Sequence, residues 1–421
     1  MIILCGAADR AITALGGRTP LEASDTPELS KLAREGQLGT IAVIGEGICP
    51  ESDSGGMALL GYDPLKAYTG RGALEALGLG FMRPGDNAAG FRINFGSFNR
   101  EVGKIDRRTA RDLSDPELQQ LVAELGAHVR LEPDGVSWSI MGFGRHRGIV
   151  CFASERLPLS GNVSNTDPGF IKQGAFGIPT PEAERANHPL PCQPLDDSPG
   201  ARNTARLVNS FCAQASEILA RSEVNLRRRR EGRLEANVVL FRDGGSQTPD
   251  LRPFRELFGV SAAFFGQIPA EQGLCKLVGA EWQDARRQPS EALEDYYRAL
   301  AARVAACDAD VTLVHVKEAD EPGHDGDPAA KLAAIERIDR HFLAPLRAAA
   351  GDGVTWVVTC DHATPCDLRI HSADPVPLLI CAPSLRADRT TAFTERQAGD
   401  GALSIARACD LMPFLQTLRA A

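Results

Sequence analysis

The sequence predicts an α/β fold in which a mostly parallel sheet is covered by helices on both faces. Continuous apolar and β-branched runs, typical of strands buried on both faces, recur at ANVVLF, VTLVHV, VTWVVT and VPLLICA. Stretches with helical apolar spacing alternate with these runs, among them SEALEDYYRALAARVAACD and AAKLAAIERIDRHFLAPLRAAA. The short apolar run Met1–Cys5, which ends at Gly6, predicts one more buried strand.

The region from about Gly78 to Pro199 has a different character. Short strand-like runs such as HRGIVCFAS are separated there by frequent Pro, Gly and Asp residues. We therefore expect a core domain made of residues 1–77 and 200–421, interrupted by an inserted α+β module at 78–199. Directly after the insertion, apolar spacing predicts a helix over Thr204–Ser222, with Asn203 or Thr204 as its N-cap.

Composition excludes several classes of function. The 421-residue chain has a net charge of −9, so no global basic field would attract nucleic acid. Its 11 cysteines form no CxxC pairs, which is typical of a reduced, cytoplasmic protein rather than a disulfide framework. No apolar run approaches 18 residues, so we expect no membrane partner.

Metal-ligand residues follow two of the predicted strands. Asp320 and His324 come after VTLVHV, and Asp361 and His362 come directly after VTWVVT. In open α/β sheets, sites form beyond the carboxyl ends of the strands, so we expect these side chains to share a crevice. Imidazole and carboxylate groups together suit divalent cations such as Zn²⁺ and Mn²⁺.

The spacing of these residues favours two ions. Asp320 and His324 are expected to converge in a tight loop, because Pro322 and Gly323 lie between them. Asp361 and His362 are adjacent, and in an extended segment their side chains would point apart, toward different ions. A pair of ions roughly 3.5–4 Å apart is the usual device for holding a phosphoryl group during displacement.

A nucleophile is also available. The segment PESDSGGM places Ser52 and Ser54 after another strand-like run, LGTIAVIGEG. A serine at the start of a helix can be exposed beside backbone N–H donors, which suits transfer of an anionic group.

Four segments together resemble the archaeal-type, cofactor-independent phosphoglycerate mutases of the alkaline phosphatase superfamily. They are PESDSGGMALLGYDP with YTGRGALEALG, DRRTAR, HVKEADEPGHDGD, and CDHATPCDLRIHSADPVP at Cys360–Pro377. The resemblance runs in order through essentially the whole chain. It implies an alkaline-phosphatase-like core with an inserted substrate-cap domain.

The resemblance also implies two divalent ions (Mn, Zn or Mg) and a transient phosphoserine at Ser52. One ion would be held by Asp320, His324 and His371, and the other by Asp361, His362 and Ser52. A small phosphorylated carboxylic acid would be bound by arginine forks, which match phosphate and carboxylate. The candidates for this role are Arg107, Arg108 and Arg111 of DRRTAR and Arg147 of RHRG, and Asp106 of DRRTAR is a further candidate for the substrate site.

The chain departs from the family pattern at several positions. Where the family has DGLGDRP, whose first Asp is a metal ligand, this chain has CGAADRA, so the ligand position is Cys5. A thiolate at this position favours softer metals such as Zn²⁺. The chain also has Gly56 where the family usually has His or Asn, and Leu257 where a Lys is common.

These departures leave three readings of the activity. The first is interconversion of 3- and 2-phosphoglycerate. The second is a phosphotransferase or phosphohydrolase acting on a related phosphorylated or phosphonylated acid, and the third is an inactive homologue that only binds its ligand. A sulfatase or nucleotide phosphodiesterase would also use such a metal cluster, but YTGRGALEALG and DRRTAR favour the mutase family.

Overall fold

The computed structural model describes residues 1–132, 135–351 and 353–420, and the chain divides into two compact units. The first unit comprises Met1–Tyr68, Asp250–Gln267 and Leu274–Ala421, and the second comprises Thr69–Pro249 and Ile268–Gly273. In the part of the chain that is described, no helix is both long enough and apolar enough to cross a bilayer.

The first unit is built on a mixed sheet, which among the described residues has seven strands in the order β11-β10-β12-β1-β13-β14-β2. The strands from β11 to β13 run parallel, while β14 pairs antiparallel with both β13 and β2. The predicted α/β class with a mostly parallel sheet is therefore confirmed. The strand bounds are β1 Ile2–Leu4, β2 Gln37–Ile41, β10 Ala262–Gly266, β11 Glu281–Asp284, β12 Val311–Val316, β13 Trp356–Thr359 and β14 Val376–Cys381.

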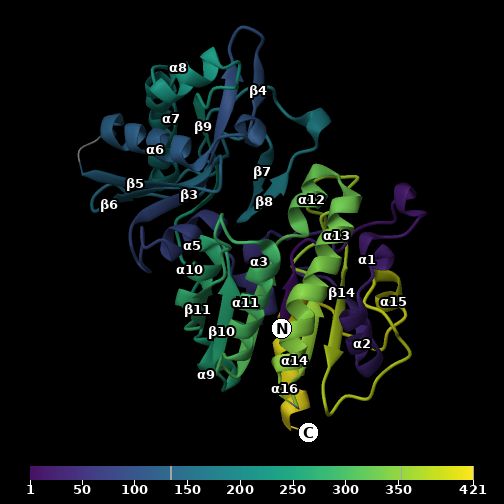
Figure 1. The fold of residues 1–421 in the computed structure, drawn as a ribbon. Coiled ribbons are helices and arrows are strands. Elements are labelled where there is room, and N and C mark those ends of the chain that lie inside the picture. The colour runs from purple at the N-terminus through teal and green to yellow at the C-terminus, as the bar shows by residue number, and fades with distance from the viewer. Residues whose placement is uncertain (133–134, 352, 421) are drawn as a thin grey trace. The chain divides into compact units, whose positions relative to one another are not determined.

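Helices surround this sheet, with α2 and α15 packed against β14 and α11 packed against α14 (Figure 1). The helices of this unit are α1 Pro20–Ala23, α2 Pro27–Glu35, α3 Ser52–Leu59, α4 Pro64–Ala67, α9 Phe254–Phe258, α11 Leu293–Ala305, α12 Asp320–Asp325, α13 Pro328–Ile338, α14 Ala344–Ala349, α15 Glu395–Gly399 and α16 Leu411–Ala420. Helix α10, Pro269–Val278, has residues in both units. A π-helical turn at Asp339–Leu343 joins α13 to α14, and short 3₁₀ turns lie at Thr13–Leu15 and Ala408–Asp410.

The second unit contains an antiparallel sheet ordered β4-β3-β6-β5, in which β9 also pairs with β3, and a small hairpin of β7 and β8. The strands are β3 Ala88–Asn99, β4 Lys104–Asp106, β5 Val136–Phe143, β6 Arg147–Ser154, β7 Phe170–Gln173, β8 Phe176–Pro179 and β9 Val238–Gly245. The helices are α5 Arg71–Gly78, α6 Asp115–His128, α7 Pro199–Ala220 and α8 Glu223–Arg230, with 3₁₀ turns at Thr109–Arg111 and Glu182–Glu184.

Two sequence predictions differ from the structure in this unit. The run ANVVLF, expected in the parallel sheet, becomes β9 and pairs antiparallel with β3. The helix expected from Thr204 begins at Pro199, because Ser198 accepts a hydrogen bond from the Ala201 N–H and caps it. The inserted module expected at 78–199 lies within the second compact unit, whose main segment is Thr69–Pro249.

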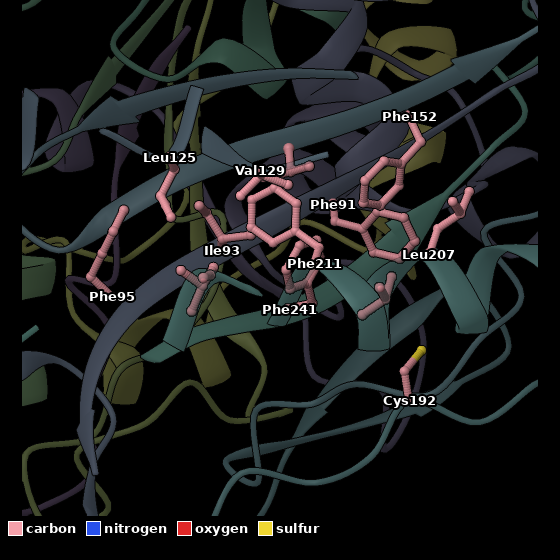
Figure 2. Close-up of a cluster of buried hydrophobic side chains, with 14 of the residues drawn as sticks. Phe91, Ile93, Phe95, Leu125, Val129, Phe152, Cys192, Leu207, Phe211 and Phe241 are labelled. Carbon is pink, nitrogen blue, oxygen red and sulfur yellow. The ribbon is translucent and has the colours of Figure 1, made fainter. Parts of the chain in front are cut away.

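The core of the second unit is rich in aromatic rings (Figure 2). Phe241 from β9 stacks on Phe152 from β6 at 6.1 Å and meets Phe211 from α7 edge-on at 5.3 Å. Trp138 from β5 also packs edge-on against Phe211, with ring centroids 5.1 Å apart. Phe211 also meets Phe152 edge-on at 6.2 Å, so it joins the helix to three strands of the sheet.

We predict that Phe211→Ala lowers the free energy of unfolding by about 3–5 kcal/mol, because it leaves a cavity among rings that cannot collapse onto it. A urea titration measures this loss. Glu217→Ala, on an exposed position of the same helix, is the matched control and should change the value by less than about 0.5 kcal/mol. Equal effects of the two variants would contradict the assignment of Phe211 to the core.

Candidate metal and nucleophile site

The site residues of the first unit lie where the central parallel strands end. Leu4 of β1 is in register with Val316 of β12, and Ile3 of β1 is in register with Thr359 of β13. The residues that follow these three strands therefore meet at one edge of the sheet. Ser52 joins them from the first turn of α3.

One group of donors consists of Asp320, His324 and His371. The Nε2 atoms of the two imidazoles are 3.1 Å apart, and each lies 3.5 Å from Asp320 Oδ1. Asp320 and His324 are not in a loop as expected, but one turn apart on α12, which places both side chains on the same helix face.

The hydrogen bonds of the two imidazoles show which nitrogens are available. His324 Nδ1 lies 3.0 Å from the carbonyl oxygen of Arg369, and His371 Nδ1 lies 3.2 Å from that of Pro50. A carbonyl only accepts, so each Nδ1 donates, and in the neutral imidazole Nε2 then presents a lone pair. Two lone pairs 3.1 Å apart repel each other unless a proton or a cation lies between them. With a carboxylate beside them, these donors fit a divalent cation.

A second group of donors surrounds the buried carboxylate of Asp361. Its Oδ2 lies 3.1 Å from His315 Nε2, 3.2 Å from His362 Nε2 and 3.3 Å from the Cys5 thiol. The side chains of Asp361 and His362 thus converge, although an extended segment would have pointed them apart.

Ser52 lies beside this second group. Its Oγ is 3.3 Å from His362 Nε2 and 3.2 Å from the ammonium nitrogen of Lys317, which also donates to Cys5 Sγ at 3.2 Å. The expected nucleophile therefore has an imidazole on one side and a fixed positive charge on the other.

Thr364 connects the two groups of donors. Its hydroxyl donates to Asp320 Oδ1 at 2.8 Å and accepts from His362 Nδ1 at 3.1 Å. Because the hydroxyl has one proton and gives it to Asp320, His362 must carry its own proton on Nδ1, and its Nε2 faces Ser52 and Asp361. One hydroxyl thus fixes the orientation of a ligand in each group.

Backbone shape is equally restricted here. Gly6 has φ of +60°, and a Cβ at this position would lie 2.5 Å from Thr364 Oγ1 and 2.7 Å from Asp320 Oδ1. Only glycine fits both the left-handed conformation and the close approach.

The charges of the two groups influence one another. Burial opposes ionisation of Asp361, yet the His362 and His315 imidazoles hold the pKa of its carboxyl well below its usual range. Burial likewise opposes ionisation of Asp320, and His324 and His371 hold its pKa well below the usual range. For Cys5, burial and Asp361 oppose ionisation, but Lys317 and His315 bring the pKa of the thiol below its ordinary value. In both groups the acidic side chains are therefore held in their ionised forms, which attract cations.

The second unit carries a separate cluster of positive charge. Burial and the neighbouring charges of Arg111 and Arg107 lower the pKa of Arg108 to about 9, and burial and Arg71 place the pKa of Arg92 well below its usual range. The residues of this cluster are Arg92, Arg107, Arg108, Arg111, Arg147 and Arg242. Such crowding of like charges favours an anionic ligand.

The arginines of the cluster differ in whether their guanidinium groups already have hydrogen-bond partners in the protein. Arg107 donates to the buried carboxylate of Asp167, with Nη2 at 2.8 Å from Oδ2. The Nε atoms of Arg92 and Arg242, in contrast, are buried without a hydrogen-bond partner among the described residues. Asp106 accepts from the backbone N–H groups of Arg108 and Ala110, so it shapes the turn that carries these arginines.

The structure brings all the expected donors of the first unit together and adds residues that the sequence did not single out. His315, Lys317 and Thr364 contact Asp361, Ser52 and Asp320 respectively. Two of them could have been found from the sequence, because His315 interrupts an otherwise apolar strand and Lys317 follows it by two residues. In the second unit, three buried residues were likewise not predicted from the sequence: Arg92, Arg242 and His146.

Comparison with known proteins gives a consistent picture. The model of the 2,3-bisphosphoglycerate-independent phosphoglycerate mutase family matches residues 33–225. The enzyme of that name from Aeropyrum pernix is 37% identical over 397 residues, covering 91% of each chain. The enzyme of that name from Methanopyrus kandleri is 35% identical over 424 residues, covering 99% of this chain and 95% of the relative. The chain belongs to this family.

Solved structures agree with this membership. The cofactor-independent phosphoglycerate mutase from Thermoplasma acidophilum is 29% identical, with a TM-score of 0.60 over 99% of this chain and 98% of that one. The PH0037 protein from Pyrococcus horikoshii is 28% identical, with a TM-score of 0.76 over 100% of this chain and 96% of that one. The mutase family thus accounts for the fold of the whole chain.

We predict that Thr364→Val weakens metal binding by roughly 10- to 100-fold, because His362 Nδ1 and Asp320 both lose their hydroxyl partner. Competition with a chelator, read as bound metal per chain, measures the loss. Thr364→Ser keeps the hydroxyl and should bind metal as the native chain does. Native affinity in the valine variant would show that the hydroxyl does not orient the ligands.

A second prediction concerns His146, which is 4% exposed. Burial and the charges of Arg147 and Arg108 lower the pKa of His146 to about 2, whereas the unfolded chain titrates near 6.5. Below pH 6.5 the unfolded state therefore binds a proton that the folded state does not, and this site lowers stability by up to about 1.4 kcal/mol per pH unit.

We therefore expect His146→Gln to flatten the loss of stability between pH 7 and pH 5, as measured by urea titration at each pH. His188→Gln, at an exposed position of the same unit, should keep the native slope. An unchanged slope in the His146 variant would mean that this imidazole takes up a proton in the folded state.

Proposed function

We propose that this protein interconverts 3-phosphoglycerate and 2-phosphoglycerate without added bisphosphoglycerate, through a phosphoserine at Ser52. Membership of the mutase family supports the reaction. The observation that carries the proposal is the position of Ser52 Oγ, 3.2 Å from Lys317 Nζ and 3.3 Å from His362 Nε2, beside two groups of metal donors.

The two groups of donors support a site for two divalent ions. One ion would be held by Asp320, His324 and His371, and the other by Asp361, His362 and Ser52 together with Cys5. When bound, such ions lower the pKa of a hydroxyl and offset the charge of a phosphoryl group.

The residues around Ser52 favour its ionised form. The Lys317 ammonium lies within hydrogen-bond distance of Oγ and stabilises the alkoxide. Ser52 is also the first residue of α3, and the positive end of the helix dipole favours an anionic group such as the transferred phosphoryl group.

The reaction consists of two transfers to and from the same oxygen. A bond forms between Ser52 Oγ and phosphorus while the bond from phosphorus to the substrate oxygen breaks, and that oxygen takes the proton released by the serine. In the second transfer the other hydroxyl of the bound glycerate attacks phosphorus while the bond from phosphorus to Ser52 Oγ breaks, and the proton of that hydroxyl passes to Ser52 Oγ. The phosphoryl group never reaches water, so no inorganic phosphate is formed.

The arginine cluster of the second unit supports an anionic substrate. Guanidinium groups bind phosphate and carboxylate in bidentate fashion, and Arg92 and Arg242 each have an unused buried Nε. We propose that Arg108, Arg111 and Arg147, together with these two, recognise the anionic groups of the substrate.

The test is a mutase assay free of bisphosphoglycerate. We expect the native protein to convert 3-phosphoglycerate to 2-phosphoglycerate, and Ser52→Ala to lower kcat by at least about 10³-fold, because no other oxygen can take the phosphoryl group. Mass spectrometry of acid-quenched enzyme should find phosphate on the peptide that contains Ser52.

Ser54→Ala is the matched control, because Ser54 lies in the same helix turn but its hydroxyl bonds only to the Glu51 backbone among the contacts described. It should keep kcat within a few-fold, which corresponds to about 1 kcal/mol or less in the barrier. Release of inorganic phosphate would show a hydrolase instead, and native activity in Ser52→Ala would place the nucleophile elsewhere.

A further inference from the structure

Cys5 adds a sulfur atom to the second group of donors, and the first group has no sulfur. Its thiol is fully buried and lies 3.3 Å from Asp361 Oδ2, 3.7 Å from His362 Nε2 and 3.8 Å from Ser52 Oγ. The first group contains only imidazole nitrogen and carboxylate oxygen.

Five of the six separations among Cys5 Sγ, Asp361 Oδ2, His362 Nε2 and Ser52 Oγ are close to those of a tetrahedral site. A zinc ion with bonds of about 2.0–2.3 Å to oxygen, nitrogen and sulfur requires ligand atoms roughly 3.3–3.6 Å apart. Besides the three distances from sulfur, His362 Nε2 lies 3.2 Å from Asp361 Oδ2 and 3.3 Å from Ser52 Oγ. Five edges of the tetrahedron therefore measure between 3.2 and 3.8 Å.

The chemistry of sulfur decides which ion suits this tetrahedron. Thiolate is a soft ligand and favours Zn²⁺ over Mn²⁺ and Mg²⁺, which prefer oxygen donors and six-fold coordination. The Lys317 ammonium, 3.2 Å from Cys5 Sγ, balances the charge of a thiolate held beside the Asp361 carboxylate.

We propose that Cys5 is a direct ligand of a thiophilic cation and makes the second site of this chain a zinc site with sulfur, nitrogen and oxygen donors. The first site, without sulfur, keeps the broader preference of a carboxylate and two imidazoles. This inference rests on the proposed function only in assuming that the protein binds metal. What it adds is the metal that each site prefers.

The experiment replaces the metal and observes the ligand directly. Protein stripped by a chelator is loaded with Co²⁺, and a thiolate ligand gives a sulfur-to-cobalt charge-transfer band in the near ultraviolet. We expect this band in the native chain and in Cys360→Ala, which removes a neighbouring buried thiol. It should be absent in Cys5→Ser and Cys5→Asp.

Metal competition gives the second readout. Stripped protein is equilibrated with equal concentrations of Zn²⁺ and Mn²⁺, and the bound metals are counted by elemental analysis. Nitrogen and oxygen sites also rank Zn²⁺ above Mn²⁺, so the comparison between variants is the informative quantity. We expect the ratio of bound manganese to zinc to rise by at least about tenfold in Cys5→Asp.

Absence of the band in the native chain, or its survival in Cys5→Ser, would overturn the proposal, as would an unchanged metal ratio in Cys5→Asp. Neither readout involves phosphoglycerate. A chain that shows the band but no mutase activity would keep this inference and lose the proposed function. An active mutase without the band would do the reverse.

Discussion

The buried carboxylate of Asp361 is the charge on which the arrangement of the first unit depends. It accepts from the Gly6 N–H at 3.2 Å and lies within 3.3 Å of Cys5 Sγ and 3.1 Å of His315 Nε2. A carboxylate removed from water without partners would cost several kcal/mol, so the residues around it must supply donors or cations. Each of the strands β1, β12 and β13 provides one of these groups at or near its carboxyl end, and together they form the site.

A buried ion pair, Lys331 with Asp9, holds the loops of the site in place. Lys331 on α13 donates to Asp9 at 2.8 Å and to the carbonyl oxygens of Ala8 and Thr364, while Asp9 accepts from the Cys366 N–H. Both charged side chains are fully buried, so all their partners come from the protein. The loop after β1 and the loop after β13 are thereby tied to one helix, which fixes Cys5 relative to Thr364.

The sequence allowed the strand ends and their ligands to be predicted, because parallel strands gather whatever follows them at one edge. For that reason the structure brings together five side chains: Asp320, His324, Asp361, His362 and His371.

The sheet to which an apolar run belongs could not be predicted this way, since β9 has the same residue pattern as β12 but pairs with β3. The site partners His315 and Lys317 were missed because a strand pattern shows which residues are buried, not what they contact. The start of α7 was predictable, since Ser198 and Pro199 carry the cap signal, but apolar spacing outweighed it.

Exposure separates the roles of the two donor groups. His324 and Asp320 have side-chain exposures of 20% and 18%, whereas His315 and Asp361 have 1% and His362 has none. An ion held by the first group can exchange ligands with molecules from solvent. An ion held by the second would be enclosed by protein donors, among them the hydroxyl of Ser52, the proposed acceptor of the phosphoryl group. The proposed Cys5 thiolate would suit this enclosed position, because a closed site needs a stable ligand set and would leave the exchange of ligands to the more exposed group.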